Sequence, residues 1–241
     1  MRLFGKNPVI ERLRNNPHSI RKIYIQRGFE KAEYIKEKAK KWGIPLILVE
    51  RDLMEKWGRN INTQGIMVDV GDFQYADYND LLDEAKQRKR ILVFLDRIND
   101  PQNLGAILRS LACLGKFAVV IPQKESAHVT EAVLRVASGG DNFVPVALVA
   151  NLTNMLKKAK TEGIWLVGAA VKDGEDLMKV KFNFPLGLVL GSEQKGIRDV
   201  TSQQLDAMVT IPIAAPHASF NVAHAAAIIA YEITRQRIIR S

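Results

Sequence analysis

From residue 91 onward, short apolar segments alternate with segments of helical spacing. The apolar segments cover residues 91–95, 118–121, 143–146, 164–169, 186–190 and 208–211. Helical patterns follow them at about residues 103–114, 128–138, 151–161, 201–205 and 221–239, and one more precedes them at residues 80–90. Strands without polar alternation are typical of a parallel sheet that helices cover on both faces. The sequence therefore predicts an α/β domain over residues 80–241.

The first 70 residues predict a smaller domain of the same class. Strands are expected at residues 20–25, 46–49 and 65–70, and helices at residues 8–14, 30–42 and 52–57. This alternation is typical of a small α/β/α sandwich. The polar residues 71–79, which begin with Gly71, are the expected linker between the two domains.

The charge of the chain is basic and unevenly distributed. The net charge is +9, and the sequence pI is about 9.6. Residues 1–75 contain 15 Lys and Arg against 9 Asp and Glu, an excess of 6, whereas residues 76–241 contain 20 against 17, an excess of 3. Because basic surfaces attract polyanions, this charge is compatible with a nucleic-acid partner for the first domain, although it also fits a protein that is merely soluble.

The composition argues against several other classes of protein. No apolar run reaches the roughly 18–20 residues that span a bilayer, and no signal peptide is recognisable, so we expect a cytoplasmic protein without a membrane partner. The single cysteine, Cys113, excludes an intramolecular disulfide and is expected to be buried in the core. The four histidines have no metal-ligand spacing, so no metal is expected.

Three polar, glycine-containing segments each follow one of the apolar strands of the larger domain. They are Asp100–Arg109 (DPQNLGAILR), Leu190–Gly196 (LGSEQKG) and Ile211–Val222 (IPIAAPHASFNV). In an open α/β sheet, ligands bind beyond the carboxyl ends of the strands, which lie along one edge. We therefore expect the three segments to build a single site.

The candidate site residues in these segments also have simpler explanations. Arg109 lies off the apolar face of its helix, so it could contact RNA or only solvent. Asn103, Ser219 and Asn221 are residue types that also cap helices. Glu193 is a lone carboxylate in a glycine turn, and His217 could contact substrate or lie in an exposed loop. The Gly-x-Gly-x-x-Gly and P-loop signatures are missing, so a dinucleotide or triphosphate turn is not expected.

Taken in this order, the three segments resemble the three motifs of the SPOUT (α/β-knot) RNA ribose 2′-O-methyltransferases. Residues 137–146 look like the connecting region of that family, and residues 63–70 resemble the end of its N-terminal L30e-like domain. The resemblance covers nearly the whole chain and is greatest for the bacterial branch that methylates a guanosine ribose in 23S ribosomal RNA. The chain departs from the usual pattern at Thr63, Gln194, Ala215 and Phe220.

The resemblance implies a fold, a cofactor and a reaction. It implies a deep trefoil knot formed by about residues 190–231, an L30e-like substrate-binding domain over residues 1–70, and a homodimer. It implies transfer of a methyl group from S-adenosyl-methionine to a ribose 2′-OH without a metal. The implied catalytic residues are Asn103, Arg109, Glu193, Ser219 and Asn221. The implied cofactor-binding residues are Ala169, Leu190, Gly191, Gly196, Ile211, Ile213 and Phe220.

Within this interpretation, Arg109 is expected to orient the 2′-OH or a neighbouring phosphate, because a guanidinium keeps its proton in nearly all settings. Two rival functions stay open. The chain could be a knotted methyltransferase that acts on a tRNA ribose or on a base nitrogen. It could also be a non-catalytic RNA-binding factor in ribosome assembly. A nicotinamide-dependent oxidoreductase is disfavoured, because its glycine fingerprint is missing.

Overall fold

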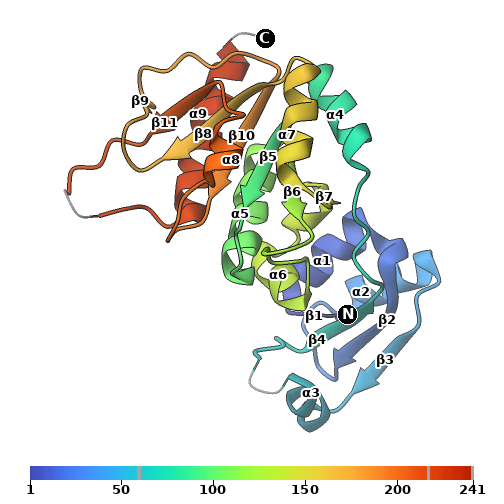
Figure 1. The fold of residues 1–241 in the computed structure, drawn as a ribbon. Coiled ribbons are helices and arrows are strands. Elements are labelled where there is room, and N and C mark those ends of the chain that lie inside the picture. Colours follow the sequence, from blue (N-terminus) through green and yellow to red (C-terminus); the bar gives the residue numbers. More distant parts are fainter. Residues whose placement is uncertain (59–60, 216–217, 240–241) are drawn as a thin grey trace.

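The computed structural model describes residues 1–58, 61–215 and 218–239, which form two α/β units (Figure 1). The first unit contains a four-stranded sheet, and the second contains a seven-stranded sheet. An extended segment after residue 70 joins the two units. None of the helices described is long and apolar enough to cross a membrane.

The sheet of the first unit is mixed and has the strand order β1-β4-β2-β3. Its strands are β1 (Arg2–Phe4), β2 (Ile20–Gln26), β3 (Leu46–Val49) and β4 (Ile66–Val70). Strand β1 was not expected from the sequence, because three residues are too few to show an alternation; it pairs antiparallel with β4. The three expected strands are all present, and β2 pairs parallel with β3.

Helices cover both faces of this small sheet, which confirms the α/β/α sandwich. Helices α1 (Lys6–Asn15) and α2 (Ala32–Trp42) pack through Leu13 and Ile35 against the face that contains Ile23. Helix α3 (Arg51–Gly58) packs on the opposite face, where Met54 contacts the side of β4 that contains Met67.

The sheet of the second unit is parallel at every pairing, as the apolar strands predict. Its strand order is β7-β6-β5-β10-β8-β11-β9. The strands are β5 (Ile91–Asp96), β6 (Phe117–Pro122), β7 (Val146–Val149), β8 (Trp165–Ala170), β9 (Glu175–Asp176), β10 (Leu186–Gly191) and β11 (Ala207–Thr210). The expected threading of residues 190–231 through a loop stays a prediction.

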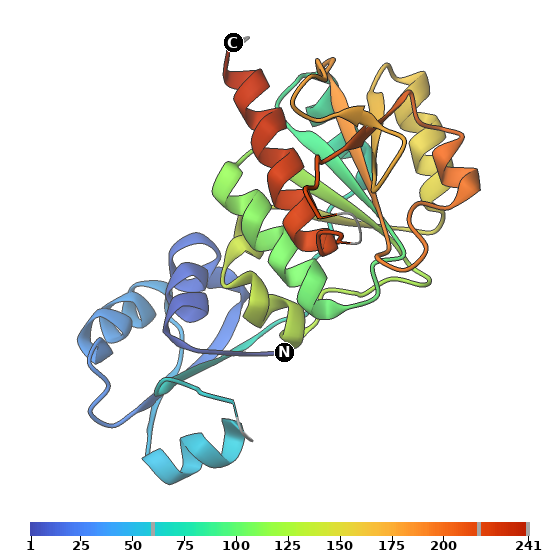
Figure 2. The same ribbon diagram turned by 90° about the vertical axis from the view of Figure 1, so that its left-hand side faces the viewer.

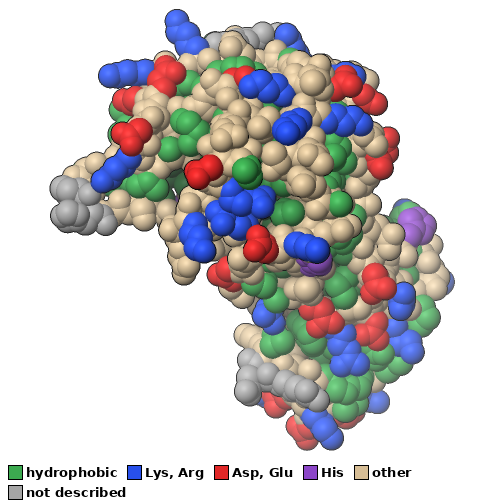
Figure 3. Space-filling model, in the orientation of Figure 1, with side chains coloured by type: hydrophobic (Ala, Val, Ile, Leu, Met, Phe, Trp, Pro, Cys, Tyr) green, Lys and Arg blue, Asp and Glu red, His purple; other side chains and the backbone are tan. Residues whose placement is uncertain are grey.

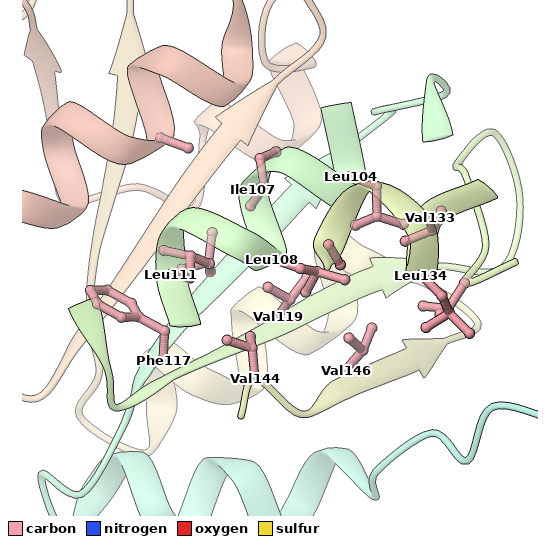
Figure 4. Packing of buried hydrophobic residues seen from close by; sticks show 14 of the residues in the cluster. Leu104, Ile107, Leu108, Leu111, Phe117, Val119, Val133, Leu134, Val144 and Val146 are labelled. Atoms are coloured by element: carbon pink, nitrogen blue, oxygen red, sulfur yellow. The ribbon is translucent and has the colours of Figure 1, made fainter. Parts of the chain in front are cut away.

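Each face of the large sheet has its own hydrophobic core. Helices α4 (Tyr78–Lys86) and α7 (Leu152–Thr161) pack on one face, and the short helix α8 (Asp199–Ser202) lies against α7. Helices α5 (Pro101–Leu114), α6 (Glu131–Ala137) and α9 (Val222–Ile239) pack on the other. Figure 4 shows this second core, where Leu104, Leu108 and Leu111 of α5 meet side chains of β6.

Four expectations about this unit are wrong in detail. The strand expected at residues 143–146 begins only at Val146, because the short 3₁₀ helix η2 (Gly140–Asn142) and Pro145 precede it. The helices expected at residues 128–138 and 201–205 lie at Glu131–Ala137 and Asp199–Ser202. Cys113 is exposed instead of buried, because it is two residues, about 200° of helix turn, beyond the buried Leu111.

The two units contact each other through α1, which lies beside α6 and η2 (Figure 2). The side chains of Arg12 and Asp141 form an ion pair across this contact and are only 6% and 1% exposed. Gly139 supplies the space for α1, since a Cβ there would lie 2.6 Å from the Cβ of Glu11. The buried pair therefore fixes the first unit onto the second next to α5.

Candidate active site

Two cavities open at the carboxyl ends of the central strands of the large sheet. The first has a volume of about 510 Å³ and is lined by residues that follow β8, β10 and β11, together with the start of α9. All seven residues that the family resemblance implies as cofactor-binding line this cavity; they are Ala169, Leu190, Gly191, Gly196, Ile211, Ile213 and Phe220. These residues come from three segments that are distant in the sequence, and they meet because the carboxyl ends of parallel strands lie at the same edge of the sheet.

Gly191 explains how two backbone segments can meet beside the first cavity. A Cβ at this position would lie 2.2 Å from both the carbonyl carbon of Gly196 and the amide nitrogen of Ile197. Real Cβ atoms do not approach backbone atoms this closely. Only glycine lets the end of β10 pass against residues 196–197, so the cavity wall here is backbone and not side chain.

A small hydrogen-bond network joins three of the five expected catalytic residues. The Nδ2 atom of Asn221 donates to Oδ1 of Asn103 at 2.9 Å and also to Oε1 of Glu193. The same Glu193 oxygen accepts from Nδ2 of Asn103 at 3.4 Å and from the backbone amide of Val222 at 3.3 Å. Oδ1 of Asn221 caps α9 by accepting from the amide of Ala223 at 2.8 Å. The network thus fastens the start of α5, the loop after β10 and the start of α9 to one another.

The loop that contains Glu193 is also anchored to the end of β5. Asp96 is fully buried; its Oδ2 accepts from the backbone amide of Arg198 at 3.0 Å, and its Oδ1 lies 2.8 Å from Nε of the same arginine. Within the loop, the amide of Gly196 donates to the carbonyl of Ser192 at 2.8 Å. These contacts hold the backbone around Glu193 in one arrangement.

The second cavity lies on the other side of the Glu193 loop and has a volume of about 400 Å³. It shares Ser192, Glu193, Gln194 and Val222 with the first cavity, so the two are neighbours. Its wall is polar and includes Asn103, Arg97 and Glu125. Sequence reasoning missed Arg97 and Glu125, although each follows the end of a central strand.

The two remaining candidates differ in position. Ser219 lines the first cavity, near Phe220. Arg109 is exposed on α5 and does not line either cavity in the described part of the chain; its backbone packs against Gly140, whose Cβ would lie 3.0 Å from the Cα of Arg109. His217 lies outside the described residues. The structure therefore brings Asn103, Glu193 and Ser219 to the cavities and leaves Arg109 on the surface of its own unit. Asn221 lines neither cavity among the described residues and reaches the site through its hydrogen bonds to Asn103 and Glu193.

This arrangement can bind one organic molecule on each side of a fixed polar wall. The first cavity mixes apolar side chains with accessible backbone, whereas most residues that line the second carry polar or charged side chains. Both volumes lie within the range of roughly 300–1,000 Å³ that small-molecule sites occupy. On the face shown in Figure 3, Lys and Arg side chains gather on this unit around α5 and α8, with single Asp and Glu side chains beside them.

Two family models match the chain. Residues 90–231 match the SpoU rRNA methylase family, and residues 2–76 match the RNA 2′-O ribose methyltransferase substrate-binding model. Among solved structures, the SpoU methyltransferase AviRb from Streptomyces viridochromogenes, in complex with AdoMet, superposes with a TM-score of 0.80. It is 24% identical, and the match covers 99% of this chain and 91% of that one. An AdoMet-bound rRNA methyltransferase from Sinorhizobium meliloti gives a TM-score of 0.81 at 22% identity, over 98% and 87% of the two chains.

Relatives of higher sequence identity span the same length. The chain is 33% identical to YacO of Bacillus subtilis, whose name places it in the TrmH family of tRNA/rRNA methyltransferases, over 98% of this chain and 95% of that protein. It is 37% identical to a protein of Mycolicibacterium vanbaalenii that is named an uncharacterized tRNA/rRNA methyltransferase, over 98% and 76% of the two chains. From its motifs, its parallel sheet and these matches, the chain belongs to the SpoU rRNA methylase family.

Proposed function

We propose that this chain transfers a methyl group from S-adenosyl-methionine to the ribose 2′-OH of a guanosine in 23S ribosomal RNA. The observation that carries the proposal is that Glu193, held in place by Asn103 and Asn221, lines both of two adjacent cavities. A transfer between two bound molecules needs their reacting atoms held about 3 Å apart in a fixed orientation, and a residue that lines both cavities can position both molecules.

The first cavity fits the cofactor. Its volume of about 510 Å³ suits a nucleoside with an amino-acid arm, and its wall at Gly191 is bare backbone that can hydrogen-bond an adenine edge. The apolar side chains of Ile211, Ile213 and Phe220 would pack on the adenosine part. S-adenosyl-methionine, when bound, supplies an electrophilic methyl group on a sulfonium.

The chain's own residues would then position the acceptor oxygen. Oε1 of Glu193 is occupied by donors from Asn221, Asn103 and Val222, which fixes the carboxylate and leaves Oε2 without a hydrogen bond within the described residues. A ribose 2′-OH that donates to Oε2 would turn an oxygen lone pair toward the first cavity. Ser219, on the wall of that cavity, can donate or accept at the same place.

Arg109 would contribute from outside the cavities. Its guanidinium is exposed on α5, so it can contact an RNA phosphate that approaches the site. We expect Arg109→Ala to lower methyl transfer while the affinity for S-adenosyl-methionine is unchanged. Undiminished turnover would refute this role.

The remaining parts of the proposal concern partners and location. The first unit would dock RNA, which its basic excess and its match to a substrate-binding model support. A homodimer is supported by apolar side chains left open on α9, where Tyr231 is 61% and Ile239 is 70% exposed. RNA of this kind is found in the cytoplasm, and we place the protein there.

The decisive test is an incubation of the purified protein with methyl-labelled S-adenosyl-methionine and unmodified ribosomal RNA, with tRNA in parallel. Digestion to nucleosides should give label in 2′-O-methylguanosine from the ribosomal RNA. Label only in tRNA would support methyl transfer but contradict ribosomal RNA as the substrate. The names of the relatives, which mention both tRNA and rRNA, keep this alternative open. Absence of cofactor binding would favour the non-catalytic assembly factor.

A further inference from the structure

Two residues on the wall of the second cavity have an unusual backbone conformation. Arg97 has φ of 63° and Glu125 has φ of 55°, and both line the cavity. A left-handed conformation costs a non-glycine residue about 1 kcal/mol or more, and it persists where the surrounding structure requires it, often at functional sites. Of the seven non-glycine residues with positive φ among the described residues, only these two line this cavity.

The fold places these two residues side by side. Arg97 follows β5 and Glu125 follows β6, and these strands are parallel neighbours in the sheet. The amide of Ala127 donates to the carbonyl of Ile98 at 2.8 Å, which joins the two loops directly. Ile98 and Ala127 are themselves buried, so this junction is a fixed part of the structure. The cavity wall between Arg97 and Glu125 is thus formed before any ligand arrives.

In the described part of the chain, both side chains keep hydrogen-bonding groups that no other protein group occupies. The Arg97 side chain is only 19% exposed, its Nε lies 3.9 Å from Asp96, and no hydrogen bond satisfies that Nε within residues 1–58, 61–215 and 218–239. Asp96 is already engaged by Arg198. Within the same described ranges, the Glu125 carboxylate has no hydrogen bond, and it does not form an ion pair with Arg97 although the two line one cavity. Arg97 and Glu125 both line the second cavity, so a guanidinium and a carboxylate are both available to a molecule bound there.

This pair of groups matches one RNA base better than the other three. Guanine presents two adjacent donors, N1–H and the N2 amine, which a carboxylate can accept together. Its O6 and N7 atoms are acceptors that an arginine binds with two hydrogen bonds. Adenine, cytosine and uracil lack the paired donors, so each would leave one carboxylate oxygen unpaired. Unstacked RNA bases are read through these edges.

We propose that the cavity between Arg97 and Glu125 binds the base of the nucleotide whose ribose is methylated, and that these two side chains select guanine. The inference rests on the proposed function, because the shared Glu193 wall then places the attached ribose beside the first cavity. Glu125 accepts from N1–H and N2, and Arg97 donates to O6 and N7. The two residues determine specificity and take no part in bond making.

The first experiment measures binding without turnover. The full-length protein is saturated with S-adenosyl-homocysteine, which blocks the first cavity, and is titrated with guanosine 5′-monophosphate or inosine 5′-monophosphate by NMR. Inosine lacks the N2 amine, so its affinity should be about tenfold lower for the wild type. In Glu125→Gln the two affinities should be nearly equal. No binding of guanosine 5′-monophosphate, or an inosine penalty that persists in Glu125→Gln, overturns the proposal.

The second experiment uses methyl transfer at the nucleotide that the wild type modifies. An RNA with inosine at that position should lose about tenfold in kcat/KM with the wild type and nothing further with Glu125→Gln. If inosine lowers kcat/KM by the same factor in Glu125→Gln as in the wild type, the two effects are independent and the proposal is overturned. Failure of the wild type to methylate any RNA would overturn the proposed function and the placing of a methylated ribose, whereas the binding experiment decides guanine selection by Arg97 and Glu125 independently.

Two further variants separate recognition from folding. Arg97→Gly removes the guanidinium and keeps a residue suited to φ of 63°, so it should fold normally, bind S-adenosyl-methionine normally and lose about tenfold or more in affinity for guanosine 5′-monophosphate. Arg88→Ala is the matched control, because Arg88 has φ of 57° and lies outside both cavities. Equal affinities in Arg97→Gly and the wild type would contradict the proposal.

Discussion

At the scale of single residues, Gly191 has the least room for a side chain. A methyl group there would lie 2.2 Å from the backbone of Gly196 and Ile197, which cannot move aside as a flexible side chain could. We expect Gly191→Ala to displace residues 196–197 and to lower the free energy of unfolding by roughly 1–3 kcal/mol, the usual cost of overpacking. Affinity for S-adenosyl-methionine should fall at the same time, as measured by calorimetry.

Gly71 provides the matched control for this prediction. A Cβ at Gly71 would meet its nearest atoms at 3.8–3.9 Å, which is ordinary contact. Gly71→Ala should therefore leave both stability and cofactor affinity near the wild-type values. If Gly191→Ala also binds the cofactor normally, the close approach of the two backbones is not needed for the first cavity.

Asn221 has two functions that one substitution can separate. Its Oδ1 caps α9, and its Nδ2 links Asn103 to Glu193. Serine is also a good helix cap but cannot reach both partners, so Asn221→Ser should fold with little loss of stability. We expect kcat for methyl transfer to fall about 100-fold, because the carboxylate is no longer held in place.

Methyl transfer and thermal unfolding measured on the same Asn221→Ser sample would check this expectation. A wild-type kcat would show that Glu193 needs no fixed orientation. A large drop in melting temperature would instead show that the network is mainly structural.

The candidate site residues with the clearest sequence signal are those whose type and strand-end position both stand out, and the family resemblance supplied their expected roles. Gly191, Glu193 and Asn221 follow apolar strands, and the geometry of parallel sheets brings strand ends together. Arg97 and Glu125 were invisible because a left-handed backbone leaves no trace in an arginine or a glutamate. The role expected for Arg109 came from the family resemblance, whereas its position off the apolar helix face predicts only its exposure and not its distance from the cavities.

At the scale of secondary-structure elements, the ion pair between α1 and η2 is a buried polar contact between the units. Burial raises the pKa of Asp141, and the Arg12 guanidinium opposes that rise. We expect Arg12→Met to lower the free energy of unfolding at neutral pH by about 3–5 kcal/mol, because the buried carboxylate loses its counter-charge. The loss should shrink as the pH falls, since a folded state with a raised pKa takes up its proton before the unfolded chain does.

Urea denaturation of Arg12→Met across a pH series, with the double variant Arg12→Met/Asp141→Leu alongside, would test this. The double variant removes both charges and should recover most of the stability. A deficit that grows on acidification, or a double variant as unstable as the single one, would contradict the prediction.

Element boundaries were predictable where apolar runs end at turn-forming residues. The strands β5, β8 and β10 lie within one residue of their expected bounds. Strand β7 was misplaced because Phe143 and Val144 extend the apolar pattern into a turn that the packing of Gly139 and Gly140 requires. Local pattern cannot reveal such a turn, since its cause is the contact with α1 and α5.

At the scale of the whole molecule, we expect the first unit to dock RNA and the second to transfer the methyl group. Every residue that lines the two cavities lies at or beyond Arg97, so none belongs to the first unit. The first unit nevertheless holds 6 of the 9 excess positive charges within residues 1–75. Deletion of residues 1–70 should therefore leave affinity for S-adenosyl-methionine unchanged and weaken binding of ribosomal RNA by about 10-fold to 100-fold at moderate salt.

The salt dependence of RNA binding makes this prediction specific. Each lost phosphate contact lowers the slope of log K against log salt by about 0.7 for single-stranded RNA, so the truncated chain should show a distinctly shallower slope than the full chain. A filter-binding series at several salt concentrations, with cofactor affinity measured on the same samples, gives both quantities. Equal slopes would mean that the second unit, with its basic group around α5 and α8, supplies the phosphate contacts by itself, and the first unit would then need another role.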